Sequence, residues 1–422
     1  MKCLLKVCII TLLMATGNTV IAYGDNYIYD GILYQFDFEL GYFCVPAPQS
    51  QYLTRENTSI KIPNELEFQK NVFKPVRDIR VNAFSGCQYI TEMVLPDTIW
   101  YLGSQAFANC VNLKTLTLPK TVKSIGSYCF TGCVKLKEVT LPEGAILPDG
   151  LFSGCVGLET VILPKIDANV ETGRYIFRNC SRLANVTFPP TYKASIGPHM
   201  FQGCTGLKSI SIPNSIKKIS SYAFEGCTSL KSVILSSSIG ILEECAFQNC
   251  TALKSVGFSN KQPLRIKPLV FDNCISLEEV TILYDRVYAI DSGAFRGCKN
   301  LKKITIPAGI KQGIGASVFE GCAALDTVTA LIEQPYAFGR DAFKGISPTC
   351  VLMVPYGKRS AYIAAGWTEK VFKGGVKEII PAGISQVKVK TKETGWYDLQ
   401  GRKIAQPEKG HIYISGGKKV MK

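Results

Sequence analysis

Cysteine and histidine are the residues through which this 422-residue chain could do covalent or metal chemistry, and it has seventeen and two of them. Redox and metal sites usually need paired spacings such as C-x-x-C, and none occurs in the sequence. His199 stands two before a phenylalanine, where other units have tyrosine, which indicates packing. His411 has no acidic or nucleophilic partner in sequence. We therefore expect no catalytic residue, no metal site and no cofactor.

Eleven of the cysteines recur every 22–25 residues, and a phenylalanine stands three residues before each one. The unit is visible in FANCVNLKTLTLP (107–119) and FRGCKNLKKITIP (295–307). A twelfth unit keeps Phe343 but has Ile346 in the cysteine position. Such a period is typical of repeat proteins, in which each unit buries its apolar side chains against its neighbours. The predicted structural ladder consists of Phe84, Cys87, Phe107, Cys110, Phe130, Cys133, Phe152, Cys155, Phe177, Cys180, Phe201, Cys204, Phe224, Cys227, Phe247, Cys250, Phe271, Cys274, Phe295, Cys298, Phe319 and Cys322.

Each position of the unit predicts a piece of local structure. The residue before the cysteine is Gly in seven units and Asn in four, which predicts a left-handed turn. Alternating apolar residues follow, as in Leu116 and Leu118, and often Pro, which predicts a short strand. A second apolar pair, such as Val122 and Ile125, returns the chain toward the next phenylalanine. The fold class is therefore a repeat solenoid, although the length alone would suggest two or three domains.

The state of the cysteines follows from their register. Identical side chains in register point the same way, and Ile346 shows that packing alone suffices at one position. Buried thiols that behave as small hydrophobes are therefore favoured, with disulfides as the alternative. Cys129 takes an alanine position and is predicted in the core. The sequence leaves the states of Cys44, Cys245 and Cys350 open.

The unit F-x-[GN]-C-x-x-L-x-x-[IV]-x-[IL]-P, followed by segments such as IKKISSYAF (216–224), resembles the BspA-type leucine-rich repeat over residues 59–345. The resemblance implies a right-handed leucine-rich-repeat superhelix, with short parallel β-strands on the concave face and a cap at each end. It also implies a location on the surface of an anaerobic bacterium. Characterised members of this family are adhesins that bind extracellular-matrix and plasma glycoproteins such as fibronectin and fibrinogen.

Strand parity predicts which side chains face outward. If Leu116 and Leu118 point into the core, the residues between them point away from it. Thr is also a good strand former, so an exposed strand can carry it without binding anything. The loops at 167–174 and 260–267 are the alternative binding surface. The candidate binding face consists of Thr115, Thr117, Glu138, Thr140, Thr160, Asn185, Thr187, Ser209, Ser211, Ser232, Ser255, Glu279, Thr281, Lys303, Thr305, Thr327 and Thr329.

Residues 1–22 read as a signal peptide, with a basic start, an apolar stretch and a small-residue cleavage site. We expect cleavage between Ala22 and Tyr23, and therefore export. The apolar stretch is too short to span a bilayer, and no later segment approaches 18 apolar residues. The net charge of +15 divides into +2 in residues 1–22, +6 in residues 385–422 and +7 in the rest. A nucleic-acid binder would concentrate this charge on one surface, so no nucleic-acid partner is expected.

The chain divides at the ends of the repeats. We expect an N-terminal cap with a degenerate first repeat at 23–83, repeats at 84–345, a C-terminal capping repeat at 346–384 and a basic tail at 385–422. Within these segments, Asp30-Gly31 predicts a hairpin, 59–63 a first strand and 358–365 a helix. The tail resembles C-terminal modules associated with secretion or surface attachment. Its strand-like pieces are 396–399, 411–415 and 418–421, and the alternative is a flexible basic tail with no such role.

The sequence therefore favours an exported or cell-surface binding protein that engages a protein or glycoprotein of a host or a neighbouring cell without catalysis. A structural envelope protein with no specific ligand is the second hypothesis. An enzyme is the third, and it would need a polar cluster in the caps or tail. The sequence has no P-loop, dinucleotide-binding fingerprint or nucleophile elbow.

Overall fold

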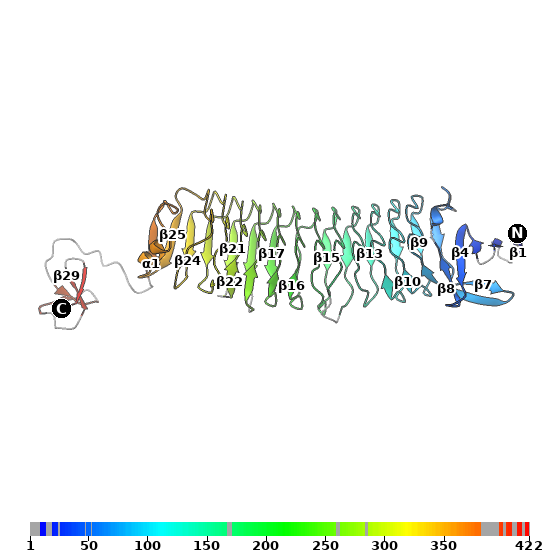
Figure 1. The fold of residues 1–422 in the computed structure, drawn as a ribbon, viewed down its shortest axis with the longest axis horizontal. Helices are drawn as coiled ribbons and strands as arrows, with labels where there is room; N and C mark the ends of the chain where they lie inside the picture. The colour runs from blue at the N-terminus through cyan, green and yellow to red at the C-terminus, as the bar shows by residue number, and fades with distance from the viewer. Residues whose placement is uncertain are drawn as a thin grey trace, which may run out of the picture. The chain divides into compact units, whose positions relative to one another are not determined.

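The structure is a computed structural model that describes residues 9–13, 19–23, 26–46, 48–51, 53–166, 171–258, 262–282, 286–380, 396–399, 402–406, 412–415 and 418–421. It consists of two compact units, Met1–Lys377 and Glu378–Lys422, and each is described by itself. The first unit contains the repeats, whose coils follow one another in chain order from blue to orange (Figure 1). The repeat solenoid that the spacing predicted is confirmed.

Short strands of successive coils, most of them after a ladder cysteine, pair in parallel in three groups that span residues 59–187, 232–282 and 303–355, and we call these groups together the principal sheet. The predicted first strand, 59–63, is its first member. An isolated parallel bridge between Ser209 and Ser232 continues the pairing where no named strand is present. The strands are β6 (Ser59–Lys61), β9 (Glu92–Val94), β11 (Thr115–Thr117), β13 (Glu138–Thr140), β14 (Thr160–Ile162), β15 (Asn185–Thr187), β17 (Ser232–Leu235), β19 (Ser255–Phe258), β21 (Glu279–Ile282), β23 (Lys303–Ile306), β24 (Thr327–Ala330) and β25 (Val351–Pro355).

A second row of short parallel strands lies where the sequence indicated only a return segment. In two of these coils a glycine, Gly103 or Gly126, follows the strand and allows close approach of the chains, because a Cβ on Gly126 would lie 2.2 Å from the backbone nitrogen of Ser104. The strands are β8 (Val72–Ile79), β10 (Tyr101–Leu102) and β12 (Ser124–Ile125), and then β16 (Lys218–Ile219), β18 (Ile241–Leu242), β20 (Leu264–Ile266) and β22 (Val287–Ile290).

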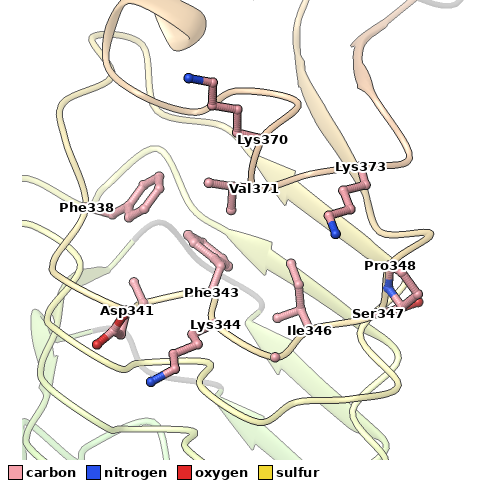
Figure 2. A pocket seen from close by; sticks show the side chains of 12 residues that line it. Phe338, Asp341, Phe343, Lys344, Ile346, Ser347, Pro348, Lys370, Val371 and Lys373 are labelled. Atoms are coloured by element: carbon pink, nitrogen blue, oxygen red, sulfur yellow. The ribbon is translucent and has the colours of Figure 1, made fainter.

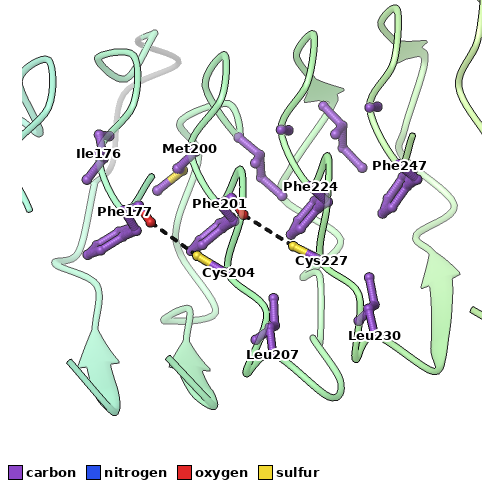
Figure 3. Packing of buried hydrophobic residues seen from close by; sticks show 14 of the residues in the cluster. Ile176, Phe177, Met200, Phe201, Cys204, Leu207, Phe224, Cys227, Leu230 and Phe247 are labelled. Atoms are coloured by element: carbon purple, nitrogen blue, oxygen red, sulfur yellow. Dashed lines mark hydrogen bonds between the residues drawn. The ribbon is translucent and has the colours of Figure 1, made fainter. Parts of the chain in front are cut away.

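Stacked phenylalanine rings run through the core. From Phe84 to Phe343, successive ring centroids lie 5.0–5.7 Å apart, with interplanar angles of 6–21°. The cysteine of each coil and the leucine that follows it are buried beside the rings, as Figure 3 shows for Cys204 and Leu207. A coil of 22–25 residues could not bury its phenylalanine ring alone, so the coils share one continuous core.

The turn around each phenylalanine is joined to the next coil by three backbone hydrogen bonds. In the coil of Phe84, the N–H groups of Asn82, Phe84 and Gly86 donate to carbonyls of the following coil. The same three bonds, 2.7–3.1 Å long, recur in every coil from Phe84 to Phe319. The residue before each cysteine is left-handed, for example Asn109 at φ 59°, which confirms the predicted turn.

The N-terminal part is an antiparallel meander that adds to the second row of strands. It contains β1 (Ile9–Leu13), β2 (Thr19–Tyr23), β3 (Asn26–Tyr29), β4 (Ile32–Asp37) and β5 (Tyr42–Val45), and β5 pairs with β8 in parallel. The predicted hairpin between β3 and β4 is confirmed, with Asp30 at φ 49° and Gly31 at φ 73°. A 3-10 helix, η1 (Gln49–Gln51), follows, and β7 (Glu65–Gln69) forms a hairpin with β8. Strands β1 and β2 are formed largely by the predicted signal peptide.

The last repeat is covered by α1 (Arg359–Ala364), which lies within the predicted helix 358–365. The hydroxyl of Tyr362 donates to the carbonyls of Ala330 and Ile332, each at 2.9 Å. Trp367 is fully buried behind it. Strand β26 (Val376–Ile379) spans the boundary between the two units in the sequence.

The second unit contains a small antiparallel sheet in the order β28-β27-β29-β30. The strands are β27 (Trp396–Tyr397), β28 (Lys403–Ile404), β29 (Ile412–Ser415) and β30 (Lys418–Met421). The sequence pattern predicted three of them but did not predict β28. His411 lies outside the described residues. None of the helices that the structure describes has the length and apolarity needed to cross a membrane.

Candidate binding surface

The outward positions of the principal sheet lie in successive coils, and we call them the strand face. In β11, Thr115 and Thr117 are exposed while Leu116 between them is buried. The same alternation places every residue of the candidate binding face on the outer side, with Thr160, Ser255, Thr281, Thr327 and Thr329 half-buried and the others exposed. The parallel register sets equivalent residues side by side, as in Thr160 beside Asn185. The strand face is therefore a row of short polar side chains.

Three exposed apolar side chains interrupt this polar row. Ile234 is 73% exposed, and Val94 and Ile162 are also exposed. The register places Ile234 beside Gly257 of the next strand, which has no side chain to cover it. The alternation of the strands predicts that these three positions face outward, but it does not predict how exposed each side chain is. A partner that covers this surface would remove these apolar side chains from water.

Charges on the strand face are few, and two of its carboxylates have a hydroxyl partner. Glu279 accepts a hydrogen bond of 3.0 Å from the Thr281 hydroxyl, and the Ser59 hydroxyl lies 3.5 Å from a carboxylate oxygen of Glu92. Lys303 is exposed. Such a surface can accept and donate hydrogen bonds over a long distance without strong electrostatic selection.

The cysteines of the ladder have a role that the sequence analysis missed. From Cys110 to Cys322, each Sγ donates a hydrogen bond of 3.1–3.3 Å to the carbonyl of the phenylalanine in the preceding coil. Figure 3 shows two of these bonds. All the cysteines that the structure describes are free and buried, including Cys44, Cys129, Cys245 and Cys350. They pack as hydrophobes, as expected, and also act as weak donors between coils.

Burial lowers the reactivity of ladder thiols as nucleophiles. It raises the pKa of Cys87 to about 11 and that of Cys227 to about 12, from the ordinary 9.0. The thiolate is the reactive form, so these two thiols are poor nucleophiles near neutral pH. Among the described residues, no three His, Cys, Asp or Glu side chains gather in a way that could hold a metal ion.

His199 lies in an aromatic stack on the turn edge of the solenoid. Its ring stands between those of Tyr175 and Tyr222, with centroid distances of 4.6 and 4.7 Å. Its Nδ1 lies 3.0 Å from the amide oxygen of Gln202. Burial lowers the pKa of His199, which favours the neutral ring. The partner of its imidazole is an amide, so the geometry is that of a packing residue.

A polar side chain follows the phenylalanine on the same turn edge in every coil except that of Phe107, where Ala108 stands. The Arg296 guanidinium binds both carboxylate oxygens of Asp272, at 2.8 and 3.0 Å, and Gln248 donates to the same carboxylate. Further along, Lys344 lies 3.3 Å from Glu320, whose pKa is lowered by hydrogen bonds from Ser317 and Lys344. Except for the contact between Ser317 and Glu320, these contacts join residues 24 apart, so only the repeat register could have predicted them.

One polar cluster lies in the N-terminal cap, where an enzyme site would be sought. Arg80 is 2.9 Å from Asp37, and the Tyr42 hydroxyl donates to Asp78 at 2.9 Å. Burial raises the pKa of both Asp78 and Cys44. The carboxylates are therefore engaged with partners and the thiol is kept protonated, which is the arrangement of a structural ion-pair network.

The loops that formed the alternative surface are described in part, with residues 167–170 and 259–261 outside the described ranges. In the described part of the first loop, Glu171 forms an ion pair of 2.7 Å with Lys218. In the second, Arg265 and Lys267 pair with Asp291 and Glu243. These charged side chains are thus engaged within the solenoid.

Comparison with known proteins places these observations in context. The BspA type leucine rich repeat region matches residues 54–172, 170–284 and 264–357. A leucine-rich repeat protein from Bacteroides ovatus is 26% identical, with a TM-score of 0.56 over 84% of this chain and 99% of that one. A leucine rich cell surface protein from Faecalibacterium prausnitzii is 22% identical, with a TM-score of 0.48 over 81% of this chain and 97% of that one. Comparison with curated protein sequences gives no match.

Proposed function

Because this chain belongs to the BspA-type leucine-rich repeat proteins, we propose that it is an exported or cell-surface binding protein that engages macromolecules of a host or a neighbouring cell. Leucine-rich repeat proteins of this type occur on bacterial surfaces and mediate protein interactions. The proposed binding surface is the strand face, and the proposed mode is non-catalytic, multivalent contact.

The observation that carries the proposal is the projecting Ile234 within a long polar row. A partner laid along the strand face would bury this side chain and gain about 1.5–3 kcal/mol from its removal from water. The threonine and serine hydroxyls around it would form hydrogen bonds with a protein or glycoprotein surface. Many weak contacts on one rigid scaffold would act together, with little conformational entropy lost on binding.

Export is proposed from residues 1–22, whose pattern is that of a signal peptide. Cleavage after Ala22 would remove β1 and most of β2 and would leave β3 as the edge of its sheet. The absence of catalysis is proposed because the polar cluster of the N-terminal cap is an internally paired network.

The test is binding of the chain from Tyr23 to immobilised fibronectin and fibrinogen, with albumin as the negative control. Two variants change the strand face: Ile234→Ser, and a triple substitution of Thr187, Ser209 and Ser211 by Lys. The matched control is a triple substitution by Lys of Ser181, Thr205 and Thr228, which are exposed just after the cysteine in three coils.

We expect saturable binding that both strand-face variants weaken by about tenfold or more and that the control triple leaves unchanged. Binding that survives both strand-face variants would move the site to the loops or caps. Absence of saturable binding to any immobilised protein or glycoprotein would favour the structural envelope protein instead.

A further inference from the structure

The last coil of the solenoid keeps the donors of a coil interface but has no coil to receive them. In every coil from Phe84 to Phe319, the three N–H groups of the turn bind carbonyls of the next coil. The equivalent groups in the last coil belong to Asp341, Phe343 and Gly345. Within the part of the chain that the structure describes, these N–H groups have no protein acceptor. The capping repeat covers the Phe343 ring with Trp367 and Phe372 but leaves the backbone uncovered.

These donors lie at a groove of about 470 Å³ between the last turn and the loop after α1. We call it the end groove, and it is lined by residues 341–348 of the turn and by Phe338, Lys370, Val371 and Lys373 (Figure 2). Ile346 and Val371 give it a half-buried apolar floor. The isoleucine in place of the ladder cysteine therefore faces a cavity in this coil.

The charge around the end groove is positive. Three lysines are exposed at its rim: Lys344, Lys370 and Lys373. Lys344 forms an ion pair with Glu320. Lys370 and Lys373 have no ion-pair partner among the described residues. Asp341 is the one acidic residue of the lining, and it pairs with Arg340 at 3.4 Å.

We propose that the end groove binds an extended acidic peptide segment of a partner protein. Donors on alternate residues match the carbonyls that an extended main chain presents, which is how strand addition recognises peptides. The lysines select acidic side chains on that segment, and the apolar floor accepts a small aliphatic one. This site is separate from the strand face and stands whether or not the strand face binds.

The chain's own ends fit the end groove poorly. The tail, residues 385–422, carries a net charge of +6 and would be repelled by the lysines. The first coil of a second copy would offer carbonyls, but the Ala83 carbonyl already accepts the Gln49 N–H of η1 at 2.7 Å. A partner with acidic side chains is thus the occupant that the charges favour.

The test uses a fluorescein-labelled peptide of sequence Gly-Glu-Glu-Val-Glu-Glu and the full chain, with affinity measured by fluorescence anisotropy. The double variant Lys370→Glu, Lys373→Glu reverses the charge at the rim of the groove. The matched control is Lys135→Glu, Lys137→Glu, which reverses two exposed lysines of an earlier coil. Hydrogen exchange of residues 341–345 reports whether the backbone donors are engaged, and tripolyphosphate serves as an anion without a main chain.

We expect saturable binding, a loss of about tenfold or more in the rim variant and no change in the control, because two attractive charges become repulsive. Exchange of residues 341–345 should slow with the peptide and stay fast with tripolyphosphate. The proposal is overturned if the peptide does not bind, if the rim variant binds it equally well, or if the exchange of these amides stays fast in the complex. The strand-face variants should bind this peptide normally, so the two sites are tested independently.

Discussion

The Sγ of Cys227 lies 3.2 Å from the backbone carbonyl oxygen of Phe201 and donates a hydrogen bond to it from the following coil. The same relationship joins nine other cysteines of the ladder to the phenylalanine of the coil before. One small residue thus fills the core and gives a second hydrogen bond to a carbonyl that already accepts the backbone N–H of the cysteine in its own coil. A purely apolar side chain of similar size would do only the first.

Replacing Cys227 by alanine should lower the free energy of unfolding by about 1–2 kcal/mol. The variant loses the thiol's hydrogen bond and leaves a small cavity in a tightly packed core. Urea unfolding followed by circular dichroism measures the difference. The reciprocal control is Ile346→Cys, which restores the repeat residue in the last coil and should cost less than about 1 kcal/mol. Equal stability of Cys227→Ala and the native chain would show that the thiol contributes nothing.

Replacing Phe224 by alanine should lower the free energy of unfolding by about 3–5 kcal/mol. The ring is fully buried and stacks on Phe201 and Phe247, so its loss leaves a gap in the continuous row. Phe73→Ala is the matched control, because its ring is 48% exposed, and it should cost less than about 1 kcal/mol. Thermal melts of both variants make the comparison. Similar losses in the two would argue against a stacked core.

Replacing Gln105 by glycine should raise the free energy of unfolding by about 0.5–1 kcal/mol. Gln105 is exposed and has a φ of 56°, a conformation that costs a side-chain-bearing residue about 1–2 kcal/mol and glycine almost nothing. The same change at Lys114, exposed and outside the left-handed region, should destabilise the chain instead. Urea unfolding should show changes of opposite sign in the free energy of unfolding of the two variants. A lower free energy of unfolding at both positions would contradict the strain argument.

Stability should fall steeply as the pH rises above about 9. Burial raises the pKa of Cys87 to about 11 and those of Cys227 and Cys350 to about 12, from 9.0. Between these values the unfolded thiols lose their protons while the folded ones keep them. Each thiol therefore contributes stability below pH 9 that is lost at about 1.4 kcal/mol per pH unit above it. The measurement is the melting temperature between pH 7 and 10.5, which should fall above about pH 9.

The triple variant with alanine at Cys87, Cys227 and Cys350 isolates the thiols from other groups that titrate in this range. Lysine and tyrosine side chains are unchanged in it, so its melting temperature should fall less steeply with pH than that of the native chain. Parallel pH profiles for the two proteins would assign the alkaline loss to groups other than these thiols.

The repeat architecture was predictable because each coil repeats the same short sequence pattern. A glycine or asparagine before Cys110 or Cys133 specifies the left-handed turn, and alternation around Leu116 specifies the strand. Eleven repetitions make these weak signals unambiguous. The outward positions of the strands were predictable in the same way. Side chains alternate between the two faces of a strand, so the residues between the buried ones must face outward.

Features that depend on distance between coils were not predictable. The bond from Cys227 to Phe201 and the pairing of Arg296 with Asp272 need the coil spacing, which the sequence does not state. The second row of strands is only two to four residues long in the repeats, too short for a periodic signal. The exposure of Ile234 depends on its neighbour being Gly257, a fact of register that appears once the strands are aligned.

The three turn hydrogen bonds described for Phe84 are chemically identical at every border between coils. A coil can therefore be gained or lost as a whole without any new backbone hydrogen bond having to arise, because each surviving neighbour meets the same turn donors and acceptors as before. The length of this protein is in this sense its least constrained property. Duplication of a gene segment could lengthen the strand face in whole coils while both caps remain unchanged.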